Sequence, residues 1–343
     1  VKKVDLLAEE KKVDKKKDFV SDQEVRWCPG CGDYAILSSI QMAMTKIGKK
    51  KEDIVFVSGI GCSSRFPYYM NTYGLHTIHG RAPAIATGLK VQNPDLEVWV
   101  PTGDGDALSI GGNHFIHALR RNVNINILLF NNEIYGLTKG QYSPTSDPGL
   151  VTKSSPHGSL DRSFKPASLA LGSGATFIAR TIDTDPKHMI ETFVEASKHK
   201  GTSLIEVLQN CIIFNDKIHD LQTSRLTRDD TTVRLKHGEP MIFGKDKNKG
   251  LKLNGFNPEV VSLDDENINE SDLIIHDETD YNNASMLSRL QAPDFPVPLG
   301  VIRKVQKDAS YDVQVKQQID AVKEKAGSGS IEKLLHSGET WKV

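Results

Sequence analysis

The chain has 343 residues and a formal net charge of −1, from 43 Lys and Arg against 44 Asp and Glu. A balance this close to neutral argues against a protein that binds nucleic acid by neutralising phosphates. The apolar runs fall far short of the ~20 residues that a membrane span needs, and the first residues carry no apolar segment typical of a secretory signal. Four cysteines are too few for a disulfide scaffold, so we expect a reducing, cytoplasmic compartment.

Residues 1–20 form a charge-rich segment that precedes the first periodic pattern. The segment contains the basic clusters Lys11-Lys12 and Lys15-Lys16-Lys17. A basic binding arm is one reading of this composition, but a solvated terminus is the commoner outcome. We therefore expect a mobile charged tail.

Between residues 21 and 225, patterns of buried strands alternate with patterns of amphipathic helices. Over 33–47 the apolar residues recur at spacings of 3, 4 and 7, and Gly48 supplies a helix stop. The other helices are expected over 82–91, 107–121, 166–172 and 186–200, and the strands over 53–58, 96–101, 124–131, 176–180 and 203–208. This alternation predicts an α/β domain built on a doubly wound parallel sheet.

Residues 226–343 show much weaker periodicity. The stretch 226–295 is polar and reads as loop, and a proline-rich stretch follows over 292–298. Helices are expected only near 311–324 and 331–336. We interpret this part as an irregular C-terminal extension that packs on the first domain and on a partner, not as a second independent core.

A glycine-rich turn, Gly103-Asp104-Gly105-Asp106, joins the strand 96–101 to the helix that follows. Backbone N–H groups and the positive end of the helix dipole make such a turn a binding site for a diphosphate, although a turn of this kind can also simply connect two elements. Asn131 and Asn132 end the next strand and therefore fall at the same edge of a parallel sheet. The Asp104 carboxylate, an Asn amide oxygen and a main-chain carbonyl near Ile134 would supply three of the oxygen ligands that Mg²⁺ prefers.

The four cysteines occur at informative places. Cys28 and Cys31 form a Cys-Pro-Gly-Cys loop, while Cys62 and Cys211 each follow a predicted strand. Four thiolates can bind Zn²⁺ or an iron–sulfur cluster. Structural zinc sites usually contain two close Cys pairs and this sequence has one, so the residues alone leave zinc, a cluster and unligated cysteines open.

The glycine-rich turn and the paired asparagines together resemble the thiamine-diphosphate motif of thiamine-dependent enzymes. The resemblance implies the diphosphate-binding domain of that family, with Mg²⁺ held by Asp104, Asn132 and the main-chain carbonyl of Ile134. It also places Gly103, Gly105 and Asp106 in the cofactor-binding turn. His79 is a further candidate for contact with the diphosphate or the substrate, with ordinary packing as the alternative.

Thiamine diphosphate stabilises the carbanion left when a 2-oxo acid loses CO₂, and an oxidative enzyme must then remove two electrons. An iron–sulfur cluster takes electrons one at a time, so the thiamine motif favours a cluster over zinc. The combination resembles the β subunit of 2-oxoacid:ferredoxin oxidoreductases over nearly the whole chain. The motifs that carry the resemblance are Cys28-Pro-Gly-Cys31-Gly-Asp33, Gly61-Cys62-Ser-Ser64, His79-Gly-Arg-Ala82, Gly103-Asp-Gly-Asp106, Asn210-Cys211, Glu239-Pro-Met-Ile-Phe-Gly244 and Phe295-Pro-Val-Pro-Leu-Gly300.

Membership of that family would imply one [4Fe–4S] cluster on Cys28, Cys31, Cys62 and Cys211. It would also imply conversion of a 2-oxo acid, coenzyme A and oxidised ferredoxin to an acyl-CoA, CO₂ and reduced ferredoxin, or the reverse reaction as a synthase. The glutamate that activates thiamine lies in a separate pyrimidine-binding domain, for which this sequence has no second series of strands and helices. The resemblance therefore implies an α subunit, an α2β2 assembly, and no activity from this chain alone.

The substrate is expected to be 2-oxoglutarate. Arg65 follows Cys62 closely, and Leu137, Thr138 and Lys139 follow the paired asparagines. Two cations near the reacting carbon suit a second, distal carboxylate, and family members that act on 2-oxoglutarate are similar at these positions. A surface ion pair for Arg65 and a phosphate contact with coenzyme A for Lys139 remain alternatives.

Three other functions fit parts of the sequence. The chain could serve a pyruvate or branched-chain 2-oxo acid enzyme, act as a non-catalytic iron–sulfur carrier, or be a zinc-stabilised nucleotide-binding scaffold. Neither of the histidine pairs near the sites, His76 with His79 and His114 with His117, has nearby serine and aspartate residues that suggest a hydrolase triad.

Overall fold

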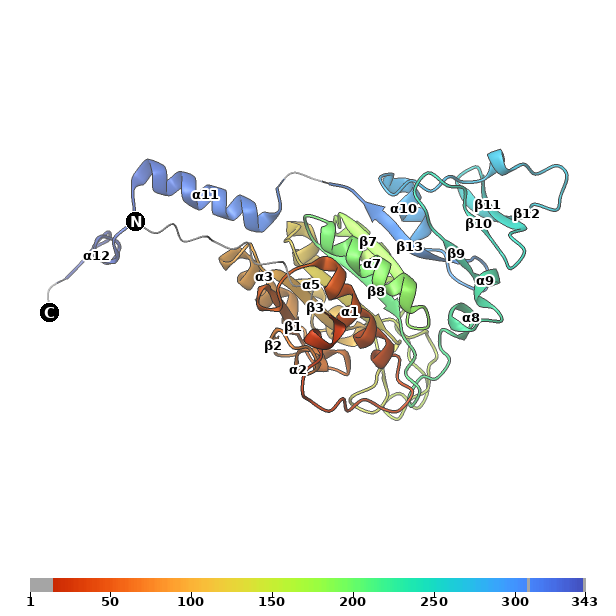
Figure 1. Cartoon of the computed structure of the whole chain (residues 1–343), viewed down its shortest axis with the longest axis horizontal. Coiled ribbons are helices and arrows are strands. Elements are labelled where there is room, and N and C mark those ends of the chain that lie inside the picture. The colour runs from red at the N-terminus through yellow and green to blue at the C-terminus, as the bar shows by residue number, and fades with distance from the viewer. Residues whose placement is uncertain (1–14, 307–308, 342–343) are drawn as a thin grey trace, which may run out of the picture.

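The computed structural model describes residues 15–306 and 309–341. At its centre lies an eight-stranded sheet with the order β2-β1-β3-β4-β8-β7-β13-β9 (Figure 1). Six neighbouring strands run parallel: β1 (Ile54–Ser58), β2 (Tyr73–His76), β3 (Glu97–Gly103), β4 (Asn126–Asn131), β7 (Phe177–Ile182) and β8 (Ser203–Leu208). The predicted parallel α/β sheet is confirmed, and β2 is an edge strand that the sequence pattern did not indicate.

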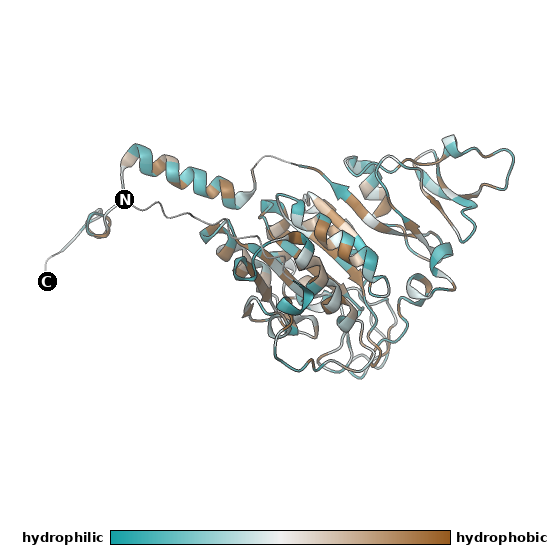
Figure 2. Ribbon diagram, in the orientation of Figure 1, coloured by the Kyte–Doolittle hydropathy of each residue, from teal (hydrophilic) through white to brown (hydrophobic). Residues whose placement is uncertain are grey.

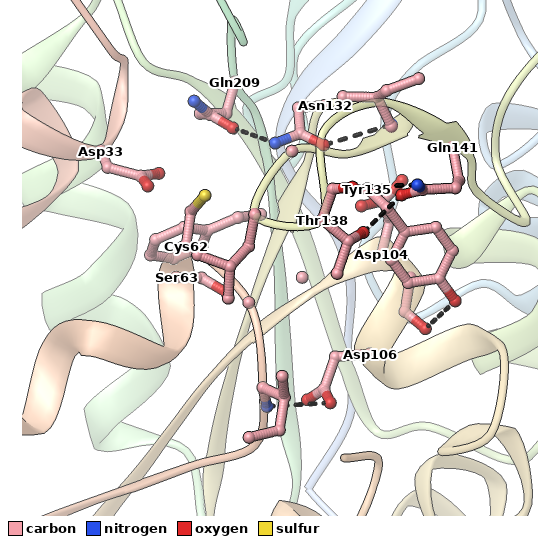
Figure 3. Close-up of a pocket in the computed structure, with 18 of the residues that line it drawn as sticks. Asp33, Cys62, Ser63, Asp104, Asp106, Asn132, Tyr135, Thr138, Gln141 and Gln209 are labelled. Atoms are coloured by element: carbon pink, nitrogen blue, oxygen red, sulfur yellow. Dashed lines mark hydrogen bonds between the residues drawn. The ribbon is translucent and has the colours of Figure 1, made fainter. Parts of the chain in front are cut away.

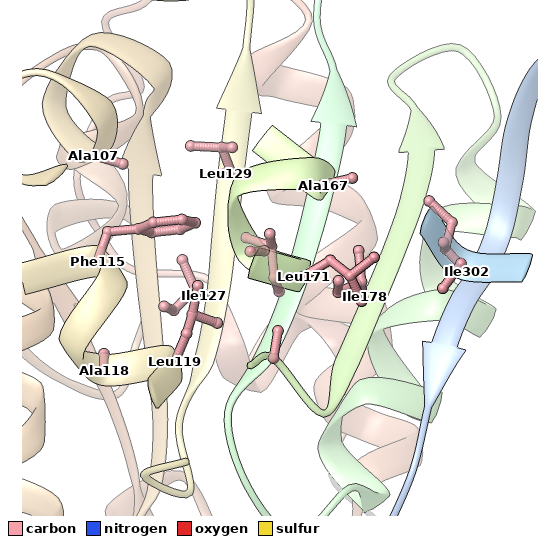
Figure 4. Close-up of a cluster of buried hydrophobic side chains, with 14 of the residues drawn as sticks. Ala107, Phe115, Ala118, Leu119, Ile127, Leu129, Ala167, Leu171, Ile178 and Ile302 are labelled. Atoms are coloured by element: carbon pink, nitrogen blue, oxygen red, sulfur yellow. The ribbon is translucent and has the colours of Figure 1, made fainter. Parts of the chain in front are cut away.

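Helices cover both faces of this sheet, and each face has its own apolar core. The helices α1 (Asp33–Ile47) and α7 (Pro186–Lys198) pack on one face with Trp99 and Phe130, and α3 (Ala82–Gln92), α5 (Gly112–Arg121) and α6 (Pro166–Gly172) pack on the other. Figure 4 shows Phe115, Ile127 and Leu171 meeting between α5, α6 and the sheet. Burial on both faces explains why the central strands read as continuous apolar runs, which Figure 2 shows in brown.

The helix expected over 107–121 is interrupted. A short helix, α4 (Asp104–Leu108), begins inside the glycine-rich turn, and α5 begins only at Gly112. The break falls at Ser109, whose ψ of −110° is not helical, and it precedes the pair Gly111-Gly112. The loop after β4 also contains structure that the sequence did not indicate: a small hairpin of β5 (Ile134–Tyr135) and β6 (Gln141–Tyr142).

The expected mobile tail lies mostly outside the described residues, because residues 1–14 are not described. Residues 15–20 do not fit that expectation. They form the 3-10 helix η1 (Lys16–Phe19), the Phe19 side chain is fully buried, and Lys16 Nζ donates a hydrogen bond to Ser38 Oγ of α1 at 2.6 Å. Phe19 anchors this end of the chain because an aromatic side chain gains most from leaving water.

The C-terminal extension is less irregular than the sequence suggested. β13 (Val297–Lys304) joins the central sheet antiparallel to β7, and β9 (Thr232–Arg234) lies beyond it. Pro298 misled the sequence reading, but it lies in the part of β13 that pairs only with β9. The remaining elements there are the sheet of β10 (Ile242–Phe243), β11 (Lys249–Asn254) and β12 (Asn257–Ser262), with α8 (Asp220–Thr223), α9 (Arg228–Thr231), η4 (Glu270–Asp272) and α10 (Tyr281–Leu287).

The last two helices, α11 (Tyr311–Ala326) and α12 (Ile331–Leu335), extend away from the sheet (Figure 1). Near its start, α11 is tied to the body, because the buried Asp312 carboxylate accepts a hydrogen bond from the backbone N–H of Asn124 at 3.0 Å. Two short 3-10 helices, η2 (Lys51–Asp53) and η3 (Ser63–Arg65), and the helix α2 (Phe66–Tyr69) flank β1. No helix in the described part of the chain combines the length and apolar character needed to cross a membrane.

We predict that β13 contributes to the stability of the whole domain. Ile302 of β13 is fully buried in the same apolar core as Ile178 of β7. Ile302→Ala should lower the free energy of unfolding by about 2–5 kcal/mol, the usual cost of emptying a buried aliphatic site. Urea unfolding measures the change, with Ile331→Ala on the exposed α12 as the control, expected within about 0.5 kcal/mol of the parent. An Ile302→Ala protein as stable as that control would show that β13 is only loosely attached.

Candidate functional site

A cavity of about 460 Å³ opens at the carboxyl edge of the parallel strands. Its walls come from the segments that follow β1, β3, β4 and β8. Parallel strands end at one edge of a sheet, so residues far apart in the sequence meet there. Figure 3 shows Asn132 and Gln209 at one end of this cavity and Asp106 at the other.

The structure brings all the predicted cofactor residues to this cavity: Gly103, Asp104, Gly105, Asp106, Asn132, Ile134 and His79 line it. Leu137 and Thr138, predicted to contact substrate, line it as well. Arg65 and Lys139 do not line it, but both line a neighbouring cavity described below. The ligand roles of these residues stay predictions.

Asp104 lies at the first position of α4 and is almost fully buried. Its Oδ2 accepts hydrogen bonds from the hydroxyls of Ser143, at 2.5 Å, and Thr145, at 2.6 Å. Burial nevertheless raises the pKa of Asp104 to about 6, because these hydrogen bonds compensate only part of the cost of burying a charge. A divalent cation beside this carboxylate would offset that cost.

Asn132 offers a second oxygen at the same wall. Its Nδ2 donates to Gln209 Oε1 at 2.8 Å, and its Oδ1 accepts from the backbone N–H of Ile134 at 3.2 Å. A carboxylate and an amide oxygen are the hard ligands that Mg²⁺ prefers. The donor set therefore fits the predicted magnesium site.

Asp106 has its hydrogen-bonding capacity engaged by the protein. Its Oδ1 accepts from the backbone N–H groups of Ile60, at 3.1 Å, and Gly80, at 2.7 Å, and lies 2.6 Å from His79 Nδ1. Its Oδ2 accepts from the Thr102 hydroxyl at 2.7 Å. Asp106 thus ties three loops together, and it directs the other ring nitrogen of His79 away from this carboxylate.

Gly105 is required by a close approach of the chain to itself. A Cβ at this position would lie 2.3 Å from the ring of Tyr135, whose hydroxyl donates to the Gly105 carbonyl at 2.9 Å. No larger residue fits between the turn and the β5–β6 hairpin without displacing one of them. The contact with the Tyr135 ring is therefore sufficient to explain a glycine at this position.

A second cavity, of about 390 Å³, contains all four cysteines in its lining. Cys28 is exposed and the other three are half-buried. Gly136 lies between Cys62 and Cys211: a Cβ there would be 3.6 Å from one sulfur and 3.4 Å from the other, so the two sulfurs are at most 7.0 Å apart. Four thiols around one space form a donor set that fits an iron–sulfur cluster.

Within the described residues, no group of three or more His, Cys, Asp or Glu side chains converges as the ligands of a single metal ion do. The thiols surround a space instead. Burial, followed by the Asp33 carboxylate, raises the pKa of the Cys31 thiol above its usual range, and the same two causes raise the pKa of Cys62 to about 12. Burial likewise raises the pKa of Asp33 to about 7. Burial therefore favours the neutral thiol at Cys31 and Cys62, and a metal bound there would displace the two protons.

The two cavities share a wall. Asp33, Cys62, Asn132, Gly136, Leu137 and Gln209 line both. A third cavity, of about 250 Å³, adjoins them and is lined by Arg65, Tyr68 and His76 among others. Arg65 is held there by its Nε, which donates to the Tyr69 hydroxyl at 2.8 Å.

A chain of buried polar side chains leads from the sheet to Asp104. Arg180 of β7 and Glu206 of β8 are opposite each other in the sheet, and Arg180 Nε donates to Glu206 Oε2 at 2.8 Å. Glu206 Oε1 accepts from Asn131 Nδ2 at 2.9 Å, and Asn131 Oδ1 lies 3.0 Å from the Thr145 hydroxyl that also reaches Asp104. The first of the paired asparagines therefore has a different task from Asn132.

Sequence reasoning missed several of these residues. Gln209 directly follows a strand and lies two positions before Cys211, which was an available signal. The sequence contains no comparable signal for Ser143 and Thr145. They belong to a polar loop, and no motif or residue spacing shows that this loop folds back onto Asp104. Arg180 and Glu206 were hidden within strands, where a charged pair is recognisable only once the register is known.

Comparisons with known proteins agree with this geometry. Residues 59–207 match the family model described as "Thiamine pyrophosphate enzyme, C-terminal TPP binding domain". The span includes the glycine-rich turn, the paired asparagines and Cys62. The fold and the first cavity thus define a thiamine-diphosphate-binding domain.

Three known proteins narrow the class. The 2-oxoglutarate oxidoreductase subunit KorB of Mycobacterium tuberculosis is 53% identical over 335 residues, 96% of this chain and 88% of its own. The 2-oxoacid:ferredoxin oxidoreductase subunit beta of a Sulfolobus species is 50% identical over 55% of this chain and 63% of its own length. A solved structure, the 2-oxoglutarate:ferredoxin oxidoreductase from Magnetococcus marinus with 2-oxoglutarate, coenzyme A and succinyl-CoA bound, matches with a TM-score of 0.74 at 32% identity, over 97% of this chain and 98% of that one.

The chain belongs to the family of 2-oxoacid:ferredoxin oxidoreductase β subunits. It is accordingly a subunit of an oxidoreductase, as the sequence motifs predicted.

We predict that the Arg180–Glu206 pair is needed for stability. Arg180→Met leaves a buried carboxylate without its partner and should lower the free energy of unfolding by about 3–5 kcal/mol. Adding Glu206→Gln removes that charge and keeps an oxygen for Asn131, so the double variant should recover part of the loss. Urea unfolding of both variants measures this. A loss below about 1 kcal/mol for Arg180→Met, or no recovery in the double variant, would contradict the assignment.

Proposed function

We propose that this chain is the β subunit of a 2-oxoglutarate:ferredoxin oxidoreductase. The complex would convert 2-oxoglutarate, coenzyme A and two oxidised ferredoxins to succinyl-CoA, CO₂, two reduced ferredoxins and a proton, or run in the opposite direction as a synthase. The observation that carries the proposal is the shared wall: the thiamine-diphosphate cavity and the four-cysteine cavity adjoin through Cys62, Gly136 and Gln209. Electrons leaving the first site would have a receiver directly beside it.

In this proposal the cavity residues divide into three tasks. Asp104, Asn132 and the Ile134 carbonyl would hold Mg²⁺ and, through it, the diphosphate. Thiamine diphosphate would supply the electron sink for decarboxylation. Asp106 would keep the loops carrying His79 and Ile60 in place, so that the cavity keeps its shape without its cofactor.

The four cysteines would hold one [4Fe–4S] cluster. All four line one cavity that adjoins the thiamine-binding cavity, and a place beside a source of electrons suits a cluster, which takes up electrons, more than a zinc ion, which does not. Four unpaired thiols suit a reducing compartment, and we propose a cytoplasmic location.

The site would be completed by another chain. We propose an α subunit in an α2β2 assembly, which would contribute the glutamate that activates thiamine. Ile60 and Leu137, which line the cavity, and Ile78 beside it are exposed to extents of 36%, 49% and 77%, as apolar residues at a covered cavity mouth would be in the absence of their cover. Ferredoxin would be the external electron acceptor.

Arg65 supports 2-oxoglutarate as the substrate. Tyr69 holds its guanidinium beside the third cavity, within reach of a carboxylate that has entered from the thiamine side past Leu137. Pyruvate has no such distal charge. Lys139 lines the cysteine cavity but not the third cavity, and contact with a phosphate of coenzyme A is its alternative role.

The first test is turnover of the co-purified α and β subunits. We expect CoA-dependent reduction of ferredoxin with 2-oxoglutarate to exceed that with pyruvate or 2-oxoisovalerate by at least roughly tenfold. The complex should show a broad iron–sulfur absorbance near ~400 nm that dithionite bleaches. Faster turnover of pyruvate would reassign the substrate, and a colourless complex with stoichiometric zinc would overturn the enzyme assignment.

The second test concerns Arg65. Arg65→Ile should raise KM for 2-oxoglutarate roughly 10- to 100-fold and leave KM for 2-oxobutyrate nearly unchanged, because only the first substrate loses a charge-assisted hydrogen bond of about 1.5–3 kcal/mol. Arg26→Ile is the matched control, since Arg26 also lines the cysteine cavity but is largely exposed. Equal changes for both acids would remove Arg65 from the substrate pocket.

A further inference from the structure

Gln209 lies in the wall that the two cavities share. It is the first residue after β8, it is 1% exposed, and it lines both cavities. Its Oε1 accepts from Asn132 Nδ2 at 2.8 Å, while its Nε2 donates to Cys31 Sγ at 3.4 Å and to the Asn210 carbonyl at 2.6 Å. One side chain thus contacts a predicted magnesium ligand and a predicted cluster ligand.

We propose that Gln209 is a positioning residue that couples the two sites: it orients Asn132 toward the cation and donates a hydrogen bond to a cluster thiolate. The inference rests on the proposed function, because it assumes that both cofactors bind. It concerns a residue that the metal-ligand motifs do not include.

The orientation of Asn132 follows from the inventory of hydrogen-bonding atoms. Both hydrogens of Gln209 Nε2 are committed, one to Cys31 and one to Asn210, so only its oxygen faces Asn132. An oxygen acceptor requires Asn132 to present its NH₂ group there. The Asn132 oxygen is then turned the other way, toward the backbone N–H of Ile134 and the cavity.

The contact with Cys31 acts on the cluster. Reduction adds negative charge that is shared with the cysteine sulfurs, and an N–H donor stabilises that charge. Hydrogen bonds to the sulfurs are among the determinants of cluster potential. Removing the donor should therefore favour the oxidised cluster.

Two substitutions separate the two effects. Gln209→Glu retains an oxygen for Asn132 and has no N–H group for Cys31. Gln209→Met, of similar length, lacks both. Gln41→Met is the matched control: Gln41 is a buried glutamine of α1 that donates to the Tyr69 carbonyl at 3.3 Å and lines neither cavity.

The measurements are made on the co-purified complex. A redox titration followed by electron paramagnetic resonance gives the cluster midpoint potential, and titration with thiamine diphosphate and Mg²⁺ gives the cofactor Kd. Gln209→Met should shift the reduction equilibrium roughly tenfold toward the oxidised cluster, about 59 mV for a one-electron couple. Gln209→Glu should shift it at least as far in the same direction, because its carboxylate adds negative charge beside Cys31 as well as removing the donor. The cofactor Kd should rise roughly tenfold in Gln209→Met and stay within about twofold of the parent in Gln209→Glu.

Unchanged potentials in both Gln209 variants would overturn the inference, and so would an equal shift in Gln41→Met. A Kd raised equally in Gln209→Glu and Gln209→Met would overturn the orienting role. These failures are distinguishable from failure of the proposed function. A parent complex without a cluster signal would refute the function and this inference together, whereas a loaded parent with insensitive variants would refute the inference alone.

Discussion

The structure depends on one topological constraint: the parallel strands β1, β3, β4 and β8 all end at the same edge of the sheet. Many residues that line the two cavities directly follow one of these strands. Their positions are therefore determined by where the strands end. Cys62, Asp104, Asn132 and Gln209 are separated by 147 positions from first to last, yet they line one cavity. Because the strands are buried on both faces, apolar packing determines where they end. The polar residues that follow the strands are not needed for this packing.

The two buried carboxylates of the glycine-rich turn show how burial distinguishes their tasks. Asp106 lies among four donors supplied by the protein, so its negative charge is satisfied without a ligand. Asp104 receives two hydroxyl groups, and burial still raises its pKa to about 6. A buried charge that its surroundings do not fully compensate is the one suited to a cation. The two aspartates are two residues apart in the sequence. Asp106 stabilises the loops around the cavity, whereas the negative charge of Asp104 is only partly compensated by the protein.

Five of the central strands, the helices on both faces and the motif residues of both cavities were predictable, because apolar periodicity and short motifs report on local structure. The edge strand β2, the β5–β6 hairpin and Gln209 were missed, and three further features were hidden for physical reasons. Pro298 disguised β13, whose place in the sheet depends on pairing with a strand 120 positions earlier. Phe19 was included in the predicted charged tail, because the sequence does not show which residues pack around its buried side chain. Ser143, Thr145, Arg180 and Glu206 act across loops and strands, and side-chain partners at such separations follow from register and loop path rather than from composition.

The register between β4 and β8 places Gln209 beside Asn132. Asn131 pairs with Leu208, and the backbone N–H of Gln209 donates to the Asn131 carbonyl at 3.0 Å, so Asn132 and Gln209 continue the same ladder one step past the strands. Neighbouring strands lie about 4.7–4.9 Å apart, which is close enough for two side-chain amides on the same face to pair. A shift of one residue would turn Gln209 to the opposite face and leave Asn132 and Cys31 without it. The relative position of the two cavities is therefore set by the hydrogen-bond ladder between β4 and β8, because Asn132 and Gln209 line both cavities and directly follow these strands.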